Sequence, residues 1–202
     1  MAKLFSFPAL ATLAMAVSVS ACDTMNPAGL IAASRLDPLN TPPSEIEFAV
    51  GVPQTLRLTD GDAEFRIAFS GGTAVSTILI EETAPLLLIP GESTAPEPNA
   101  PDETVYIARI APQDAARIAA AQREIRQLRS TGTQGDGSLT VRVVGGCFTS
   151  APPTSIAVSS WLQTDPADGF VALTRQQDVA RAIGARDAAI LTAQLSPCPQ
   201  GE

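Results

Sequence analysis

Apolar and polar residues alternate along much of the chain between residues 46 and 69. A period of two places every second side chain on the same face of an extended strand, so one face is buried and the other is solvated. The pattern therefore predicts half-buried antiparallel strands. The apolar positions of this region are Ile46, Phe48, Val50, Leu56, Leu58, Phe65, Ile67 and Phe69.

Turn-forming residues interrupt these strands. The pair Gly71-Gly72 lies between two strand-like runs and is predicted to form a hairpin turn. Residues 85–90 form an apolar run bounded by prolines, which indicates an edge or return strand. Residues 90–104 contain four prolines and no bulky apolar residue. They are predicted to form a solvated loop, with a partner-binding loop as the alternative.

Helical periodicity appears later in the chain. Ile118, Ile125 and Leu128 recur at helical spacing between Pro112 and about Arg129, which predicts one amphipathic helix. Strand alternation returns over 139–143 and 156–162. Thr174 and Gln177 match a capping box that would begin a second helix, and Gly184 is expected to end it before a further helical stretch. This order predicts an α+β fold, a mainly antiparallel β-sheet with one amphipathic helix and short C-terminal helices.

The N-terminal residues have the pattern of an export signal. Lys3 precedes an apolar run that is too short and irregular for a stable membrane span. The run ends in Val19-Ser20-Ala21-Cys22, which resembles the lipobox of bacterial lipoproteins. This resemblance covers about the first 22 residues only. It implies cleavage before Cys22 and attachment to a membrane through acyl chains on that cysteine. The alternative is an ordinary cleaved signal with a chance cysteine.

The lipobox divides the chain into three parts. Residues 1–21 would be the lipoprotein signal peptide, 22–43 the lipidated N-terminus and a proline-containing tether, and 44–202 a periplasmic α+β domain, with a subdivision near 90–104 as an alternative. In some lipoproteins an aspartate directly after the lipidated cysteine opposes sorting to the outer membrane. Asp23 therefore slightly favours the inner membrane.

The residue types that the sequence lacks exclude several classes of catalytic and metal-binding site. The chain has no histidine, and Lys3 would leave with the signal. These absences exclude histidine triads, Ser-Lys dyads, Schiff-base chemistry and the usual zinc ligand, so no metal and no cofactor is expected. The formal net charge of −8 argues against a nucleic-acid partner. The side chains that remain as candidates for catalysis are the carboxylates, Tyr106 and two cysteines.

The carboxylate pairs of the sequence resemble structural features. Glu81 and Glu82 are strand neighbours that point to opposite faces, and Asp60 with Asp62 and Asp165 with Asp168 have turn contexts. A catalytic pair of carboxylates that are distant in the sequence and close in the fold remains an alternative.

Cys147 and Cys198 form an even pair once Cys22 is used for lipid. Both lie beside turn formers, and an oxidising compartment favours a disulfide between them. The alternative is a reactive thiol activated by Arg142.

Three arginines, Arg123, Arg126 and Arg129, are spaced by three on the expected helix. A solvated helix face explains them. The alternative is contact with anionic lipid headgroups or a negatively charged wall polymer.

The sequence thus favours a membrane-anchored envelope lipoprotein that acts as a non-enzymatic scaffold, assembly or binding module. Its partners would be the bilayer, through acylated Cys22, and another envelope protein or a cell-wall polymer. A carboxylate-dependent periplasmic hydrolase and a small-ligand carrier are the alternatives. Two buried carboxylates converging in one pocket would favour the hydrolase, and a large apolar cavity between sheet and helix would favour the carrier.

Overall fold

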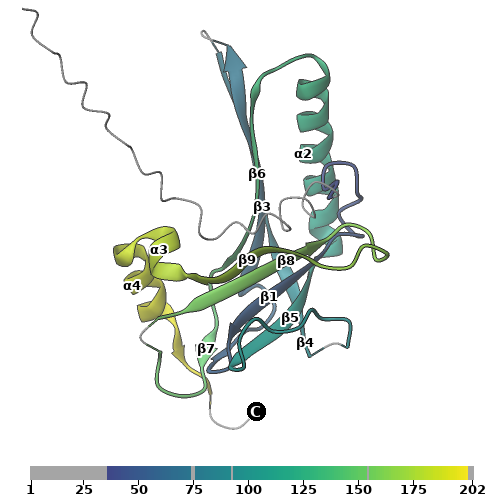
Figure 1. The fold of residues 1–202 in the computed structure, drawn as a ribbon. Helices are drawn as coiled ribbons and strands as arrows, with labels where there is room; N and C mark the ends of the chain where they lie inside the picture. Colours follow the sequence, from purple (N-terminus) through teal and green to yellow (C-terminus); the bar gives the residue numbers. More distant parts are fainter. Residues whose placement is uncertain (1–35, 74–75, 92, 154, 200–202) are drawn as a thin grey trace, which may run out of the picture.

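A computed structural model describes residues 36–73, 76–91, 93–153 and 155–199. In this part of the chain seven strands form one antiparallel sheet in the order β6-β3-β4-β5-β1-β8-β9, and β10, β7 and β2 form a small second sheet (Figure 1). The predicted α+β fold, mainly an antiparallel sheet, is confirmed at this level. The strands are β1 (Glu47–Pro53), β2 (Leu56–Arg57), β3 (Ala63–Thr73), β4 (Ser76–Pro90), β5 (Glu103–Ile110), β6 (Gly135–Val143), β7 (Cys147–Phe148), β8 (Ala157–Gln163), β9 (Val171–Asp178) and β10 (Ser196–Pro197), and the helices are α2 (Pro112–Ser130), α3 (Val179–Ile183) and α4 (Ala185–Gln194).

Strand β4 joins the two halves of the large sheet. Its first part pairs with β3 as far as Pro85, and its last part, from Leu86 to Pro90, pairs with β5. Proline has no N–H to donate, and position 85 lies where β4 changes partner, so the two ladders are least disturbed there. Strand β4 as a whole lies between β3 and β5, but residues 86–90 have a ladder partner on the β5 side only, which agrees with the predicted edge or return strand for this run. The change of partner accompanies a strong curl of the sheet (Figure 1).

The main core fills the inner face of the curled sheet. Phe48 and Phe65 meet there with ring centroids 4.8 Å apart, and α2 covers the upper part by burying Ile118 and Ile125. The predicted amphipathic helix is confirmed, because α2 buries one face and exposes Arg123 and Glu124 on the other. The helix and the long β3–β4 hairpin stand side by side in Figure 1.

The outer face of the sheet carries a smaller apolar cluster. Trp161 on β8 packs there with Ala49, Val105 and Ile107, and the loop residue Ala95 covers them. The segment between β4 and β5 is mostly exposed and forms turns and bends, as predicted for residues 90–104. Part of it nevertheless packs on the sheet. The strands on either side of it, β4 and β5, are neighbours in the same sheet.

Gly71 and Gly72 do not form the predicted turn. Both lie within β3, where they pair with Ile78 and Thr77 of β4. The physical reason is the neighbouring strand β6. A Cβ on Gly71 would lie 2.4 Å from the carbonyl oxygen of Gln134, so glycine is required for close approach of two backbones.

The predicted capping box is also wrong. Thr174 and Gln177 belong to β9, where the hydroxyl of Thr174 lies 2.8 Å from that of Ser160. Helix α3 begins later, and the carboxylate of Asp178 caps it by accepting a hydrogen bond from the N–H of Arg181 at 3.0 Å. Gly184 ends α3 with φ of 88°, as predicted for the stop between the two C-terminal stretches.

Candidate binding groove

An apolar groove of about 630 Å³ lies between the sheet and the two C-terminal helices. Strands β6 and β9 are the two edges of the large sheet, and both contribute to the lining together with β8, α3 and α4. The volume falls within the range of roughly 300–1,000 Å³ that is usual for ligand pockets. The apolar lining includes Leu139, Val141 and Val143 of β6, Val158 of β8, Leu173 of β9, Val179, Ala182 and Ile183 of α3, and Leu191 of α4.

A β-bulge directs one of these side chains into the groove. The pairing of β8 with β9 passes from Trp161↔Ala172 to Ser160↔Thr174, which leaves Leu173 as an extra residue. An extra residue shifts the alternation of a strand and re-aims a side chain. In a regular strand, neighbouring side chains point to opposite faces. Here Leu173 and its neighbour Thr174 both line the groove. The sequence contained no signal for this, because the bulge depends on the pairing with β8.

A second irregularity follows on the same strand. Between Ser160↔Thr174 and Val158↔Gln177 the register of β9 shifts again, and Gln176 adopts a positive φ of 46°. The N–H of Gln176 donates to the hydroxyl of Ser159 at 3.0 Å. Edge strands with bulges do not offer a regular ladder to another strand. The free edge of β9 is thus poorly suited to strand addition.

Few polar groups interrupt the apolar lining. Arg142 lies on the β6 side, where its Nη2 donates to Glu64 Oε2 at 3.1 Å and its side chain is about half exposed. Asp178 lies beside the groove at the start of α3. Hydrogen bonds from the hydroxyl of Ser155 and from the N–H of Arg181 hold the pKa of that carboxyl below its usual value. An apolar groove with a few placed polar groups is typical of small-molecule sites.

A smaller cavity of about 260 Å³ is lined in part by the buried residue Glu103. Its Oε1 accepts a hydrogen bond from Gln176 Nε2 at 2.9 Å, and its Oε2 accepts one from the N–H of Asn99. Asp102 also lines this cavity but is exposed. Among the residues that the structure describes, no second buried carboxylate joins Glu103. The arrangement that would favour a hydrolase is not formed in this part of the chain.

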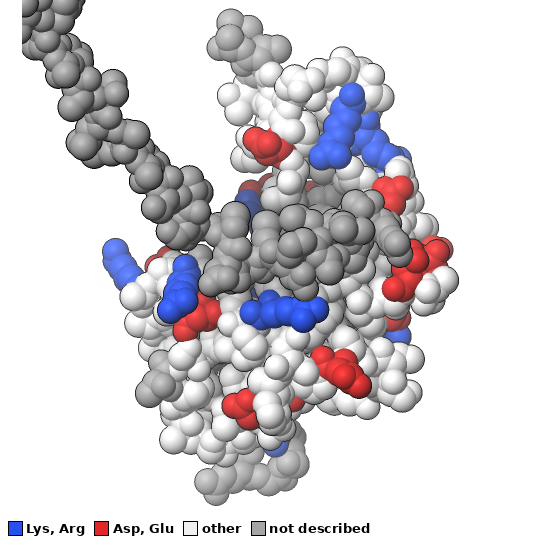
Figure 2. Space-filling model, viewed as in Figure 1, with Lys and Arg blue, Asp and Glu red and all other residues white. Residues whose placement is uncertain are grey.

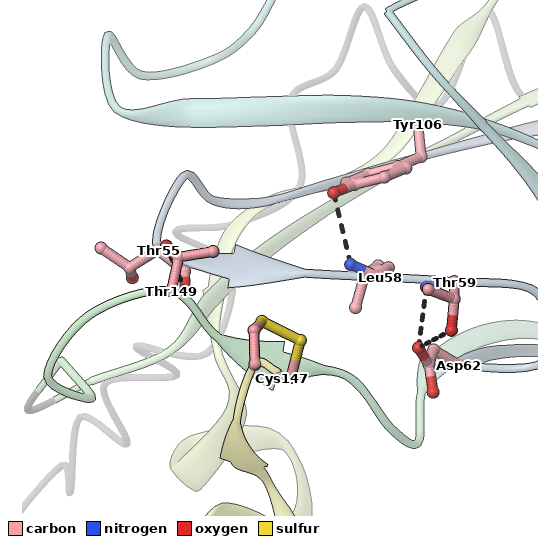
Figure 3. The surroundings of a disulfide bond; sticks show 8 residues. Thr55, Leu58, Thr59, Asp62, Tyr106, Cys147 and Thr149 are labelled. Carbon is pink, nitrogen blue, oxygen red and sulfur yellow. Dashed lines mark hydrogen bonds between the residues drawn. A yellow bond between two sulfur atoms is a disulfide. The ribbon is translucent and has the colours of Figure 1, made fainter. Parts of the chain in front are cut away.

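Cys147 and Cys198 lie at disulfide-bonding distance, so the predicted pairing is confirmed in the structure. The bond joins β7 to the chain just after β10, which runs parallel to β7. Figure 3 shows the bond below β2, with the hydroxyl of Tyr106 accepting a hydrogen bond from the N–H of Leu58 at 3.3 Å. The C-terminal helices are therefore tied to the sheet at the end of α4.

The three arginines of α2 have different surroundings. Arg126 is half-buried and donates to the carbonyl oxygen of Leu39, and the neighbouring Gln122 donates to the carbonyl oxygens of Pro38 and Thr41. These bonds hold the segment before β1 against the helix. Arg123 and Arg129 remain exposed, and Figure 2 shows basic side chains over the upper part of α2. Contact of these arginines with an anionic surface stays a prediction.

Cys22 and Asp23 lie outside the described residues, so the anchor also stays a prediction. Within residues 36–199, apart from the gaps given above, no helix has the length and apolar character needed to cross a membrane. The same residues contain no cluster of three or more His, Cys, Asp or Glu side chains arranged to hold a metal ion.

Comparison with known proteins gives no relative. Protein-family models, curated proteins and solved structures were all searched, and none of them matches this chain.

Proposed function

We propose that this chain is a membrane-anchored envelope lipoprotein whose folded domain binds an apolar ligand in the groove between the sheet and α3–α4. The observation that carries the proposal is the groove itself, since a large apolar cavity between sheet and helix favours a carrier over a purely structural module. The lipobox-like Val19-Ser20-Ala21-Cys22 supports the anchor.

Exposed apolar side chains in the groove support the same function. Leu173 is 37% exposed and Ile183 is 43% exposed, and both line the groove. Removing the rest of each side chain from water would contribute on the order of 1 kcal/mol. An apolar ligand would therefore gain free energy by covering them.

A side chain that fills the groove should abolish binding. Ala182 lines the groove and is exposed, so Ala182→Trp adds bulk there without overpacking the core. We use the unacylated chain, residues 23–202 exported behind an ordinary cleavable signal, and the uncharged dye Nile red, whose fluorescence rises in apolar surroundings. We expect the dye to bind and the substitution to weaken binding at least about tenfold.

Ala120→Trp is the matched control, because Ala120 is also an exposed alanine, lies on α2 and does not line the groove. It should leave dye binding unchanged. Equal binding by all three proteins, or no binding by any, would contradict the proposed function.

The anchor is tested at the acylated residue. In Cys22→Ser the thiol that would carry the diacylglyceryl group is missing, so the lipoprotein pathway cannot process the precursor. We expect the unprocessed precursor to accumulate without the mass of the acyl chains, and any mature-sized protein to leave the detergent phase on phase separation. Unchanged retention and unchanged mass would rule out the lipobox interpretation.

The purified chain is expected to be inactive as a hydrolase. It has no histidine, and its mature part has no lysine, so neither of the commonest nitrogen bases is present. We expect no turnover of generic ester, peptide or phosphate substrates and no effect of chelators or added divalent metal ions. Turnover that one Asp or Glu substitution abolishes would support the hydrolase instead. The first residue to substitute would be Glu103.

A further inference from the structure

We propose that the free edge of β6 pairs with the same edge of a second copy of this chain, so that two domains share one continuous antiparallel sheet. This inference does not rest on the ligand proposed for the groove. Three features of the described residues carry it: a regular open edge, the direction of the backbone groups along it, and an order of side chains that is complementary to itself.

Strand β6 is an open and regular edge of the large sheet. In the described part of the chain, β3 is the one strand that pairs with it. This pairing runs without a shift over all nine residues of β6, from Gly135 to Val143, and the strand contains no proline. Such an edge is a template for a further strand, which proteins commonly prevent with bulges, prolines or lysines. The opposite edge, β9, has two register shifts, so β6 is the edge suited to strand addition.

The hydrogen bonds to β3 show which backbone groups of β6 point outward. Beyond one end of the ladder the N–H of Gly72 donates to the carbonyl oxygen of Gln134 at 3.1 Å, and beyond the other end the N–H of Val144 donates to that of Asp62 at 2.8 Å. Residues that bond one neighbour alternate with residues that point away from it. Even-numbered residues of β6 therefore bond β3, and odd-numbered ones direct their N–H and C=O groups to the open edge. The outward residues are Gly135, Gly137, Leu139, Val141 and Val143.

A two-fold axis at Leu139, the middle residue of β6, pairs the two strands over their full length. Leu139 then lies opposite Leu139 of the second copy, and Gly137 lies opposite Val141. Outward residues face outward residues throughout, so this register allows up to about ten hydrogen bonds between the copies. A contact that uses the same surface on both copies closes at two subunits.

The side chains of β6 divide by the same alternation. Leu139 lines the groove, whereas Arg142 lies on the opposite face of the sheet, directly across from Glu64 of β3, to which it donates a hydrogen bond at 3.1 Å. Asp136 shares the face of Arg142, because both are even-numbered. Its neighbour across the β3 ladder is Ser70. This face of β6 therefore carries an acidic residue near one end and a basic residue near the other.

Full overlap makes this face complementary to itself. Asp136 lies opposite Arg142 of the second copy, and by symmetry Arg142 lies opposite Asp136. Between these two charge pairs, Ser138 and Thr140 face each other twice. All four pairs are at non-hydrogen-bonded positions, where side chains are closest, and both kinds of pair stabilise a sheet. A slip of two residues in either direction would separate Asp136 from Arg142, so the charges select full overlap.

The incoming strand brings little bulk to the groove. Val141 and Val143 line the groove, and in this register they face Gly137 and Gly135 of the second copy. Glycine adds backbone and no side chain at these two positions. The strand of the second copy therefore fits beside this half of β6.

Sedimentation equilibrium of the unacylated chain, residues 23–202, measures the association. We expect a reversible equilibrium between monomer and dimer with a Kd of about 10 μM. Gly137→Pro removes an N–H that points to the open edge and leaves the ladder with β3 intact, so it should raise the Kd at least about tenfold. Gly137→Ala is the matched control, because it keeps this N–H, and it should dimerise like the unsubstituted chain.

Charge reversal tests the register. Asp136→Arg and Arg142→Asp should each raise the Kd at least about tenfold, because like charges then face each other at two places in the dimer. An equimolar mixture of the two variants should form a heterodimer with a Kd within about fivefold of that of the unsubstituted chain, because every arginine at these positions then faces an aspartate. A folding defect in either variant could not produce this recovery.

Several outcomes would overturn the inference. A chain that stays monomeric at about ten times the expected Kd would do so, as would a dimer that Gly137→Pro leaves unchanged. A mixture of the two charge variants that stays monomeric would reject the proposed register, and oligomers larger than two would reject the two-fold contact. The proposed function is decided separately, by the binding of Nile red.

Discussion

Replacing Cys147 and Cys198 with serine is expected to lower the free energy of unfolding by about 4 kcal/mol. The two cysteines are 51 residues apart in the sequence, and the value is the loop-closure entropy for a loop of that length. A single domain is usually stable by only 5–15 kcal/mol. Urea unfolding of the double variant and of the reduced unsubstituted chain should therefore show similar, large losses.

Loss of the disulfide should destabilise the C-terminal helices α3 and α4 first. Apart from the disulfide, β10 holds the end of α4 through its short pairing with β7 and a hydrogen bond from the N–H of Cys198 to the carbonyl oxygen of Phe148 at 2.9 Å. Leu195 is the buried residue between α4 and β10. Hydrogen exchange should increase in α3 and α4 before it increases in β1. Two free thiols in the non-reduced, denatured protein would refute the bond.

Gly51→Ala is expected to lower the free energy of unfolding by about 2–3 kcal/mol, although it adds a single methyl group. Gly51 lies in β1, between β5 and β8. An added Cβ would lie 2.3 Å from Oε1 of the buried Glu103. The carboxylate would have to leave the hydrogen bonds from Gln176 and Asn99 to make room.

The control for this substitution is Gly137→Ala in β6. There the nearest atom to the added Cβ belongs to the guanidinium of Arg129, which is exposed and free to move aside. We expect a change in stability well below 1 kcal/mol at this position. Adding Glu103→Ala to Gly51→Ala should cost less than the two single losses together. Strict additivity would contradict the predicted overlap.

The sequence predicted the strands and the long helix because their signals are local. Alternation over 46–69 arises within the individual strands β1, β2 and β3, and helical spacing from Pro112 to Arg129 arises within α2, and all of these elements formed. The pairing of Cys147 with Cys198 was predicted because two cysteines remain once Cys22 is assigned to lipid, and because an oxidising compartment favours a disulfide. None of these inferences required knowledge of which strands would become neighbours.

The errors involve residues whose roles depend on distant segments. Gly71 permits close approach of the chain around Gln134, and this contact is invisible from the neighbouring sequence. Thr174 and Gln177 have the spacing of a cap, but pairing with β8 holds them in a strand. Leu173 enters the groove through a bulge in the same pairing. The groove could not be predicted because it forms where two sheet edges and the C-terminal helices meet.

The pairing of β1 has a consequence for the order of folding. Phe48 of β1 is paired with Ala108 of β5 on one side and with Leu162 of β8 on the other. A chain that emerges N-terminus first during synthesis presents β1 long before β8, which belongs to the last quarter of the sequence. The β3–β4 hairpin can close on its own, but β1 must wait, and such non-local pairing makes folding slow. During this interval the apolar face of β1 is open to other chains, so its folding yield should depend on protein concentration.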